Sequence, residues 1–130
     1  MGKAVKKKTT RCSARQLAVG AARLAHDRHC TDILVLDLRG ISPVTDYFVI
    51  ATGTSDVQMR AVADETAEWA GERGHRPLDV AGRDSARWIL LDFVDVVVHL
   101  FDDETRRYYE LELMWGDAPR VDWQRAGGRR

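Results

Sequence analysis

The stretch WILLDFVDVVVHLF, residues 88–101, decides the fold because it is typical of two strands joined by a tight turn. With Phe93 and Val94 as the turn, Leu91 pairs with Val96. Cross-strand partners lie on the same side of a sheet, and side chains alternate sides along each strand. The pairing therefore divides the side chains of this hairpin between two faces.

The two faces of the hairpin differ in chemistry. One is aliphatic and is predicted to be core. Its members are Ile89, Leu91, Val96, Val98 and Leu100. The other mixes aromatic, aliphatic and acidic groups and is predicted to contact a partner. Its members are Trp88, Leu90, Asp92, Asp95, Val97, His99 and Phe101. A one-residue change in register would exchange the two sets.

Apolar runs place the other strands. DILVLDLRG, residues 32–40, is an unbroken apolar run of the kind found in strands that are covered on both faces. DYFVIATG, residues 46–53, supplies a second strand. RPLDV, residues 76–80, is short and contains Pro77, which lacks a donor for the ladder, so we expect it at an edge of the sheet.

Capping pairs predict where the helices start. Ser13 with Gln16 forms a capping-box pattern that begins a helix over about 13–28. Ser55 with Gln58 begins a second helix in the same way.

A last helix is predicted to begin at Asp102 and Asp103, because acidic groups stabilise the positive end of a helix, and to stop at Gly116. Its predicted core-facing residues are Tyr108, Leu111, Met114 and Trp115. Tyr109 lies beside that stripe and is predicted to be free for a partner.

The resulting order, α-β-β-α-β-β-β-α, indicates the α/β fold class, as one domain with a five-stranded mixed sheet and flanking helices. We expect this domain over residues 13–116. A basic, disordered tail is predicted at 1–12, and a polar, Arg-rich tail at 117–130.

The formal net charge of zero hides an uneven distribution. Residues 1–15 carry six Lys or Arg and no acid, and residues 117–130 carry four Arg and two Asp. The middle, 16–116, holds ten basic and eighteen acidic residues, a net charge of −8. An acidic body attracts basic surfaces and repels phosphate backbones. We therefore expect a protein partner for the body and leave any direct RNA contact to the basic tails.

The sequence offers no sign of membrane contact. No apolar run approaches the roughly 20 residues of a membrane span. The first residues, MGKAVKKKTTR, also lack the apolar core of a secretory signal. We expect a cytoplasmic protein.

Catalysis deserves consideration because TGTS, residues 52–55, lies between a strand and a helix, where amides can hold a phosphate. The Walker lysine and the G-x-G-x-x-G pattern are missing. A nucleotidyltransferase would add two metal-binding carboxylates two residues apart on one strand. The nearest candidates, Asp92 and Asp95, are three apart and flank the predicted turn. A nucleotide-handling enzyme is therefore the alternative, and we expect no catalytic residue and no cofactor.

Histidine is the other candidate for chemistry. His99 shares its face with acidic residues and could act as a base, but no Ser or Cys nucleophile accompanies it, so a structural or interface role is favoured. His26, His29 and Cys30 have offsets that would suit a metal, but no fourth ligand is near, so no metal site is predicted.

Several long motifs resemble one family in order and spacing. They are DILVLDLRG at 32–40, SPVTDYFVIATGTS at 42–55, WILLD at 88–92, DVVVH at 95–99 and RRYYELE at 106–112. Together they resemble the ribosomal silencing factors, also called the Iojap family, over about 14–117.

The resemblance implies a factor that is not an enzyme. Such a factor binds protein fourteen of the large ribosomal subunit, on the face that meets the small subunit, and sterically blocks joining of the subunits. It thereby represses translation under nutrient limitation, and homodimers are common in the family. The implied fold is nucleotidyltransferase-like, and the implied contact residues are Trp88, its neighbours on the same hairpin face, and Tyr109.

Two positions depart from the family pattern. Val94 stands where the family usually has Gly, at the second turn residue, where a type I′ turn requires positive φ. Ala81-Gly82 stands where the family usually has Glu-Gly, so one acidic contact is expected to be absent.

Overall fold

The computed structural model describes residues 11–124, apart from the side chain of Glu112. The predicted tail residues 1–10 and 125–130 lie outside this range. The described chain forms one five-stranded sheet in the order β1-β2-β5-β4-β3. The strands are β1 (Thr31–Asp37), β2 (Tyr47–Thr52), β3 (Asp79–Ala81), β4 (Trp88–Asp92) and β5 (Val96–Phe101).

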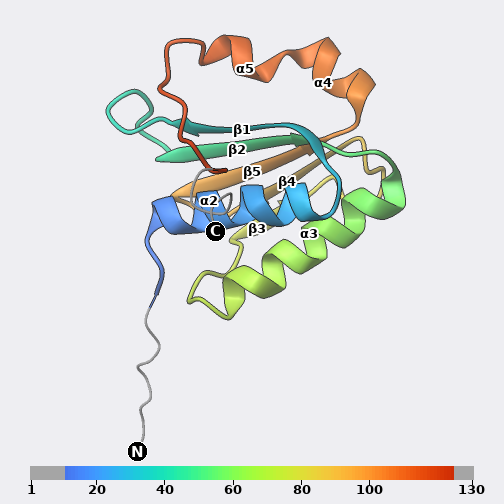
Figure 1. Cartoon of the computed structure of the whole chain (residues 1–130), viewed down its shortest axis with the longest axis horizontal. Coiled ribbons are helices and arrows are strands. Elements are labelled where there is room, and N and C mark those ends of the chain that lie inside the picture. Colours follow the sequence, from blue (N-terminus) through green and yellow to red (C-terminus); the bar gives the residue numbers. More distant parts are fainter. Residues whose placement is uncertain (1–10, 125–130) are drawn as a thin grey trace, which may run out of the picture.

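The sheet is mixed, because β2 and β5 pair in parallel while the other neighbours are antiparallel. Helices cover both of its faces (Figure 1). On one face lie α2 (Ala14–Asp27) and α3 (Asp56–Gly71). On the other lie α4 (Asp103–Tyr109) and α5 (Leu111–Met114). The predicted fold class and element order are confirmed. β3 is an edge strand as expected, but it begins at Asp79 rather than at Arg76, so Pro77 lies before it.

Local capping explains where the first two helices begin. At α2 the predicted capping box is complete, since the Ser13 side chain accepts from the amide of Gln16 and the Gln16 side chain accepts from the amide of Ser13. At α3 it is half formed. Ser55 accepts from the amide of Gln58, but the Gln58 side chain accepts from the amide of Thr54 at 2.8 Å rather than from that of Ser55.

The hairpin of β4 and β5 has a register different from the predicted one. Trp88 pairs with Phe101, two residues beyond its predicted partner. The loop residues are Val94 and Asp95, whereas the predicted turn began one residue earlier. Because side chains alternate with a period of two, a shift of two residues leaves every strand residue on its predicted face. The prediction of the pairing was wrong, and the prediction of the faces holds.

The aliphatic face of the hairpin is core, as predicted, and it packs under α2 and α3. Its buried members are Ile89, Leu91, Val96, Val98 and Leu100. The other face is partly core as well, since His99 and Phe101 are buried on it. The cause is a second core cluster between the sheet and α5, to which Phe48 and Trp115 contribute. The prediction that this whole face is a contact surface was therefore wrong for these two residues.

The hairpin turn contains a strained valine. Val94 has a φ of +77°, a region that β-branched residues rarely adopt. The Asp92 carboxylate accepts from the Val94 amide at 2.8 Å, and the Asp95 amide donates to the carbonyl of Phe93 at 3.0 Å. Asp92 therefore stabilises a tight turn that lacks the usual glycine.

The predicted last helix is broken in two. Glu110 adopts left-handed backbone angles, φ 48° and ψ 48°, between α4 and α5. The break changes the phase of the helix, so the predicted core stripe separates. Leu111 and Trp115 are half-buried, whereas Tyr108 and Met114 are exposed. The prediction of core positions was wrong for these last two residues.

Residues beyond the predicted end of the domain also pack on the sheet. Arg120 forms a β-bridge with Leu36 of β1, and the amide of Val121 donates to the carbonyl of Val35 at 2.8 Å. Val121 is buried. This segment covers the outer edge of β1, so the packed domain continues past the expected boundary at Gly116. In the part of the chain that the structure describes, no helix has the length and apolar character needed to cross a membrane.

Replacing Val94 with Gly is expected to raise the free energy of unfolding by roughly 1 kcal/mol. Gly adopts positive φ without a Cβ clash, and it loses only part of that gain to the entropy of the unfolded chain. Urea denaturation measures the change. The matched control is Val44→Gly, because Val44 is also an exposed loop valine but has no positive φ. A midpoint for Val94→Gly at or below that of the unmodified chain would contradict the prediction.

Candidate protein-binding site

Four aromatic rings form a continuous series from the core to the surface, which we call the aromatic ladder. Its members are Phe101, Trp88, Tyr109 and Tyr108. Successive ring centroids are 4.8, 5.0 and 4.9 Å apart. Exposure rises along the ladder, from 0% at Phe101 to 52% at Tyr109 and 80% at Tyr108. Trp88 is half-buried between the two ends.

Three parts of the fold position this ladder. Phe101 and Trp88 are cross-strand partners on β5 and β4, so the sheet holds their rings on one side. Tyr109 is the last residue of α4, and its ring packs against that of Trp88. That helix is tied to the sheet by Arg106, which is buried and donates to Thr52 Oγ1 at 2.8 Å and to the carbonyl of Asp32.

His99 lies beneath Trp88 and is linked to it. The indole Nε1 of Trp88 donates to Nδ1 of His99 at 3.1 Å. The imidazole is 4% exposed and packs edge-on against Phe48, with ring centroids 4.5 Å apart. Burial lowers the pKa of His99 from 6.5 to about 4, since an apolar environment disfavours the charged imidazolium. The ring is therefore neutral near pH 7.

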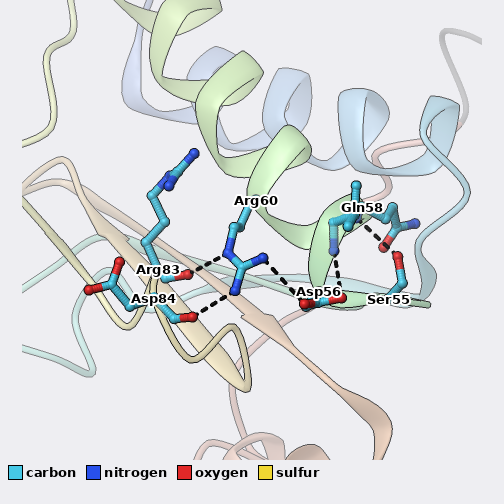
Figure 2. A network of polar contacts seen from close by, with 7 residues as sticks. Ser55, Asp56, Gln58, Arg60, Arg83 and Asp84 are labelled. Carbon is cyan, nitrogen blue, oxygen red and sulfur yellow. Dashed lines mark hydrogen bonds and ion pairs between the residues drawn. The ribbon is translucent and has the colours of Figure 1, made fainter.

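The loop before Trp88 is held by α3, as Figure 2 shows. Arg60 of that helix donates to the carbonyl of Arg83 at 3.0 Å and to the carbonyl of Asp84 at 2.6 Å. Gly82 has a φ of +80°, and a Cβ there would lie 2.0 Å from the carbonyl oxygen of Trp88. Only glycine permits this close approach, so the departure from the family at Ala81 leaves the constraint intact.

The remaining predicted contact residues lie toward the turn of the hairpin. Leu90, Val97 and Asp92 are half-buried on the same face as Trp88. Asp95 belongs to the exposed turn. The structure thus divides the predicted set between the aromatic ladder at one end of the hairpin and the turn at the other.

The turn end is acidic. Asp79 on the edge strand β3 lies directly across from Asp92, and Asp95 follows in the turn. Like charges directly opposite one another destabilise a sheet unless something neutralises them. Among residues 11–124, none of these three carboxylates forms an ion pair. Their arrangement suits a cationic partner.

Sequence reasoning missed three exposed apolar residues beside Tyr109. They are Tyr108, Leu113 and Met114. Tyr108 and Met114 are predicted to be core if the helix continues through Glu110, and Leu113 has no predicted contact role. No glycine or asparagine marks the break, so local sequence offers no signal for it. Together with Tyr109 they are the exposed apolar and aromatic side chains of the α4–α5 segment.

The turn at residues 52–55 is poorly suited to hold a phosphate. Three amides at the start of α3 already donate to side chains of the same segment. They are the amides of Thr54, Val57 and Gln58. Figure 2 shows Ser55, Asp56 and Gln58 gathered at this helix end. The opening beside them is lined by three acidic residues, Asp56, Asp102 and Asp103, and by one basic residue, Arg87. This lining has a net negative charge, which disfavours phosphate.

Metal ligands are not assembled within the described range. Among residues 11–124, no group of three or more His, Cys, Asp or Glu side chains could hold a metal ion. Asp92 and Asp95 are the nearest candidates from the sequence. Asp95 lies in the turn, and Asp92, at the end of β4, accepts from a backbone amide of that turn.

Comparison with known proteins gives a consistent result. The sequence profile of a family described as "Ribosomal silencing factor during starvation" matches residues 11–129. The chain is 49% identical over 102 residues to a Bacillus subtilis protein named ribosomal silencing factor RsfS, covering 78% of this chain and 86% of that one.

Solved structures show the same fold. A crystal structure from Chromobacterium violaceum has a TM-score of 0.77 at 30% identity and covers 81% of this chain and 88% of that one. Another from Bacillus halodurans has a TM-score of 0.68 at 39% identity, with coverage of 83% and 95%.

Acid is expected to destabilise the fold through His99. The unfolded state takes up a proton near pH 6.5, and the folded state resists it until about pH 4. The stability that this histidine contributes is therefore complete above pH 6.5 and falls by about 3 kcal/mol as the pH drops to 4. Denaturant unfolding between pH 7.5 and 4.5 measures the loss.

The matched variant for this measurement is His99→Asn, which cannot be protonated. Its stability should change much less over the same range of pH. Hydrogen bonds and ion pairs with Arg39 and Arg83 lower the pKa values of Asp37 and Asp64 from 3.8. Protonation of these two carboxylates therefore affects stability at a lower pH than that of His99. Equal slopes for the two proteins between pH 6.5 and 4.5 would refute the assignment to His99.

Proposed function

The chain belongs to the ribosomal silencing factor family, and from that premise we propose that it binds the large ribosomal subunit through protein fourteen of that subunit. Bound there, on the surface that faces the small subunit, it sterically prevents the subunits from joining. The result is repression of translation when nutrients are limiting. The family is regulatory rather than enzymatic.

The aromatic ladder is the observation that carries this proposal. Trp88 and Tyr109 present large ring areas with few rotatable bonds, and such residues are typical anchors of protein interfaces. The apolar residues Leu113 and Met114 extend the exposed surface on α5. An exposed apolar surface of this kind in a chain that is 31% charged indicates a site for another protein.

Charge supports a basic partner. The body between residues 16 and 116 has a net charge of −8. Three of its acidic residues, Asp79, Asp92 and Asp95, are grouped near the turn of the hairpin. Ribosomal proteins are basic, so complementary charge would favour encounter and fix the orientation of the complex.

Gradient sedimentation tests the proposal directly. The purified protein is mixed with isolated large subunits, and small subunits are then added. We expect the protein to sediment with the large subunit and the joined ribosomes to decrease in its presence. Binding without any loss of joined ribosomes would refute the steric mechanism, while the proposed binding to the large subunit would stand.

Truncation of the ladder is expected to weaken this binding. Trp88→Ala should cost more than about 2 kcal/mol, which is about 30-fold or more in the dissociation constant, while the domain stays folded. Tyr109→Ala should weaken binding in the same direction with little effect on stability, because Tyr109 is half-exposed. Co-sedimentation with large subunits, at several protein concentrations, measures both changes.

The control for these variants is Val57→Ala. Val57 is an exposed apolar residue on α3, in the helix layer on the other side of the sheet. Its truncation should leave binding unchanged. Unchanged co-sedimentation of Trp88→Ala would refute the proposed interface. Sedimentation velocity of each variant alone shows whether the same surface forms a homodimer that competes with the ribosome.

A nucleotide-handling enzyme is the alternative, and a heat-shift assay separates the two. Nucleoside triphosphates with Mg²⁺ should leave the melting temperature unchanged, because the amides at the start of α3 are occupied and three acidic residues outnumber the one arginine around the opening beside them. An enzyme that binds a nucleotide would gain about 2.7 kcal/mol of stability when the nucleotide concentration is 100 times the dissociation constant. A rise in melting temperature with any nucleoside triphosphate would favour the nucleotide-handling function.

A further inference from the structure

We propose that His99 is a positioning residue for the partner-binding site. Its Nδ1 accepts the indole N–H of Trp88 and thereby fixes the ring on which Tyr109 packs. This inference rests on the proposed function and adds to it. His99 does not touch the partner, because it is buried beneath the ladder.

The hydrogen bond determines the state of the imidazole. An indole N–H can only donate, so Nδ1 of His99 must be its acceptor and the ring proton lies on Nε2. The bond joins β4 to β5 through their side chains, in addition to the ladder of backbone hydrogen bonds. It fixes the rotation of the indole in a way that ring packing alone does not.

The second nitrogen shows that stability alone does not explain this histidine. Nε2 is buried and has no hydrogen-bond partner among the described residues. A buried polar group without a partner costs about 1–3 kcal/mol. An aromatic or aliphatic side chain of similar size would avoid this cost among neighbours such as Phe48 and Phe101. The buried Nε2 of His99 is thus unfavourable for stability, and the interaction that the same ring provides is the hydrogen bond that orients Trp88.

The orientation also defines what the partner meets. The donor of Trp88 is used within the protein, so the indole offers ring atoms and no free N–H. Tyr109 packs on it at 5.0 Å and is itself half-exposed. Aromatic rings without a free donor suit aliphatic side chains and the cationic groups of Lys and Arg. This chemistry agrees with the acidic turn at the other end of the hairpin.

Two polar variants separate positioning from packing. His99→Asn places an amide oxygen near the position of Nδ1, whereas His99→Gln places one near the position of Nε2. Both leave a polar group in the same buried site, so their costs to stability are similar. The first readout is hydrogen exchange of the Trp88 indole N–H, followed by NMR. We expect slow exchange in the unmodified chain and in His99→Asn, and exchange at least tenfold faster in His99→Gln.

The second readout is co-sedimentation with isolated large ribosomal subunits at pH 7.5. We expect His99→Asn to bind as the unmodified chain does, and His99→Gln to bind about tenfold more weakly. His75→Asn is the control, because His75 is also buried but bonds to the carbonyl of Cys12 under the other helix layer. It should leave both readouts unchanged.

The outcomes distinguish this inference from the function on which it rests. If Trp88→Ala loses binding while His99→Gln keeps it, the positioning role is refuted and the proposed interface stands. If His99→Asn binds as weakly as His99→Gln, packing rather than the hydrogen bond matters, and the inference is again refuted. If neither Trp88→Ala nor Tyr109→Ala affects binding, the proposed site itself is wrong.

Discussion

The pairing of β5 with β2 on one side and with β4 on the other is the constraint on which the rest of this structure depends. β5 lies in the middle of the sheet, so both of its edges are paired, and helices cover both faces of the sheet (Figure 1). Alternate residues of the strand must therefore suit two different cores. Val96, Val98 and Leu100 pack under α2 and α3, while His99 and Phe101 pack toward α4 and α5. The site exists because one of these cores opens to the surface at Trp88.

The alternation of side chains made the two faces predictable even though the turn was placed incorrectly. The error in register was two residues, and a period of two is insensitive to such an error. The turn could not be predicted, because Val94 occupies a backbone region that valine rarely adopts. The turn is stabilised by the Asp92 carboxylate and by the pairing of β4 with β5 on either side of it. Tertiary contacts of this kind leave no local pattern.

The C-terminal part of the site was the least predictable for a related reason. Tyr109 was identified as free because it lies off the expected helical stripe, and it is indeed half-exposed. Yet the exposure of its neighbours depends on the left-handed Glu110, which interrupts the helix without glycine. The packing of Val121 on β1 also required a partner distant in sequence. The family resemblance implied a contact role for the hairpin, but it did not predict which of the hairpin's residues are buried.

Burial separates the residues of the proposed site into exposed ones, which could touch a partner, and buried ones, which hold the exposed ones in place. Phe101 and His99 are buried, so any effect that they have on the proposed binding must pass through Trp88. A rigid ring loses little entropy on binding, and a ring already fixed by a hydrogen bond loses less. The buried polar cost at His99 and the strained turn at Val94 are thus found at opposite ends of the same hairpin. Such local departures from stability are expected where a surface must be kept in one conformation for a partner.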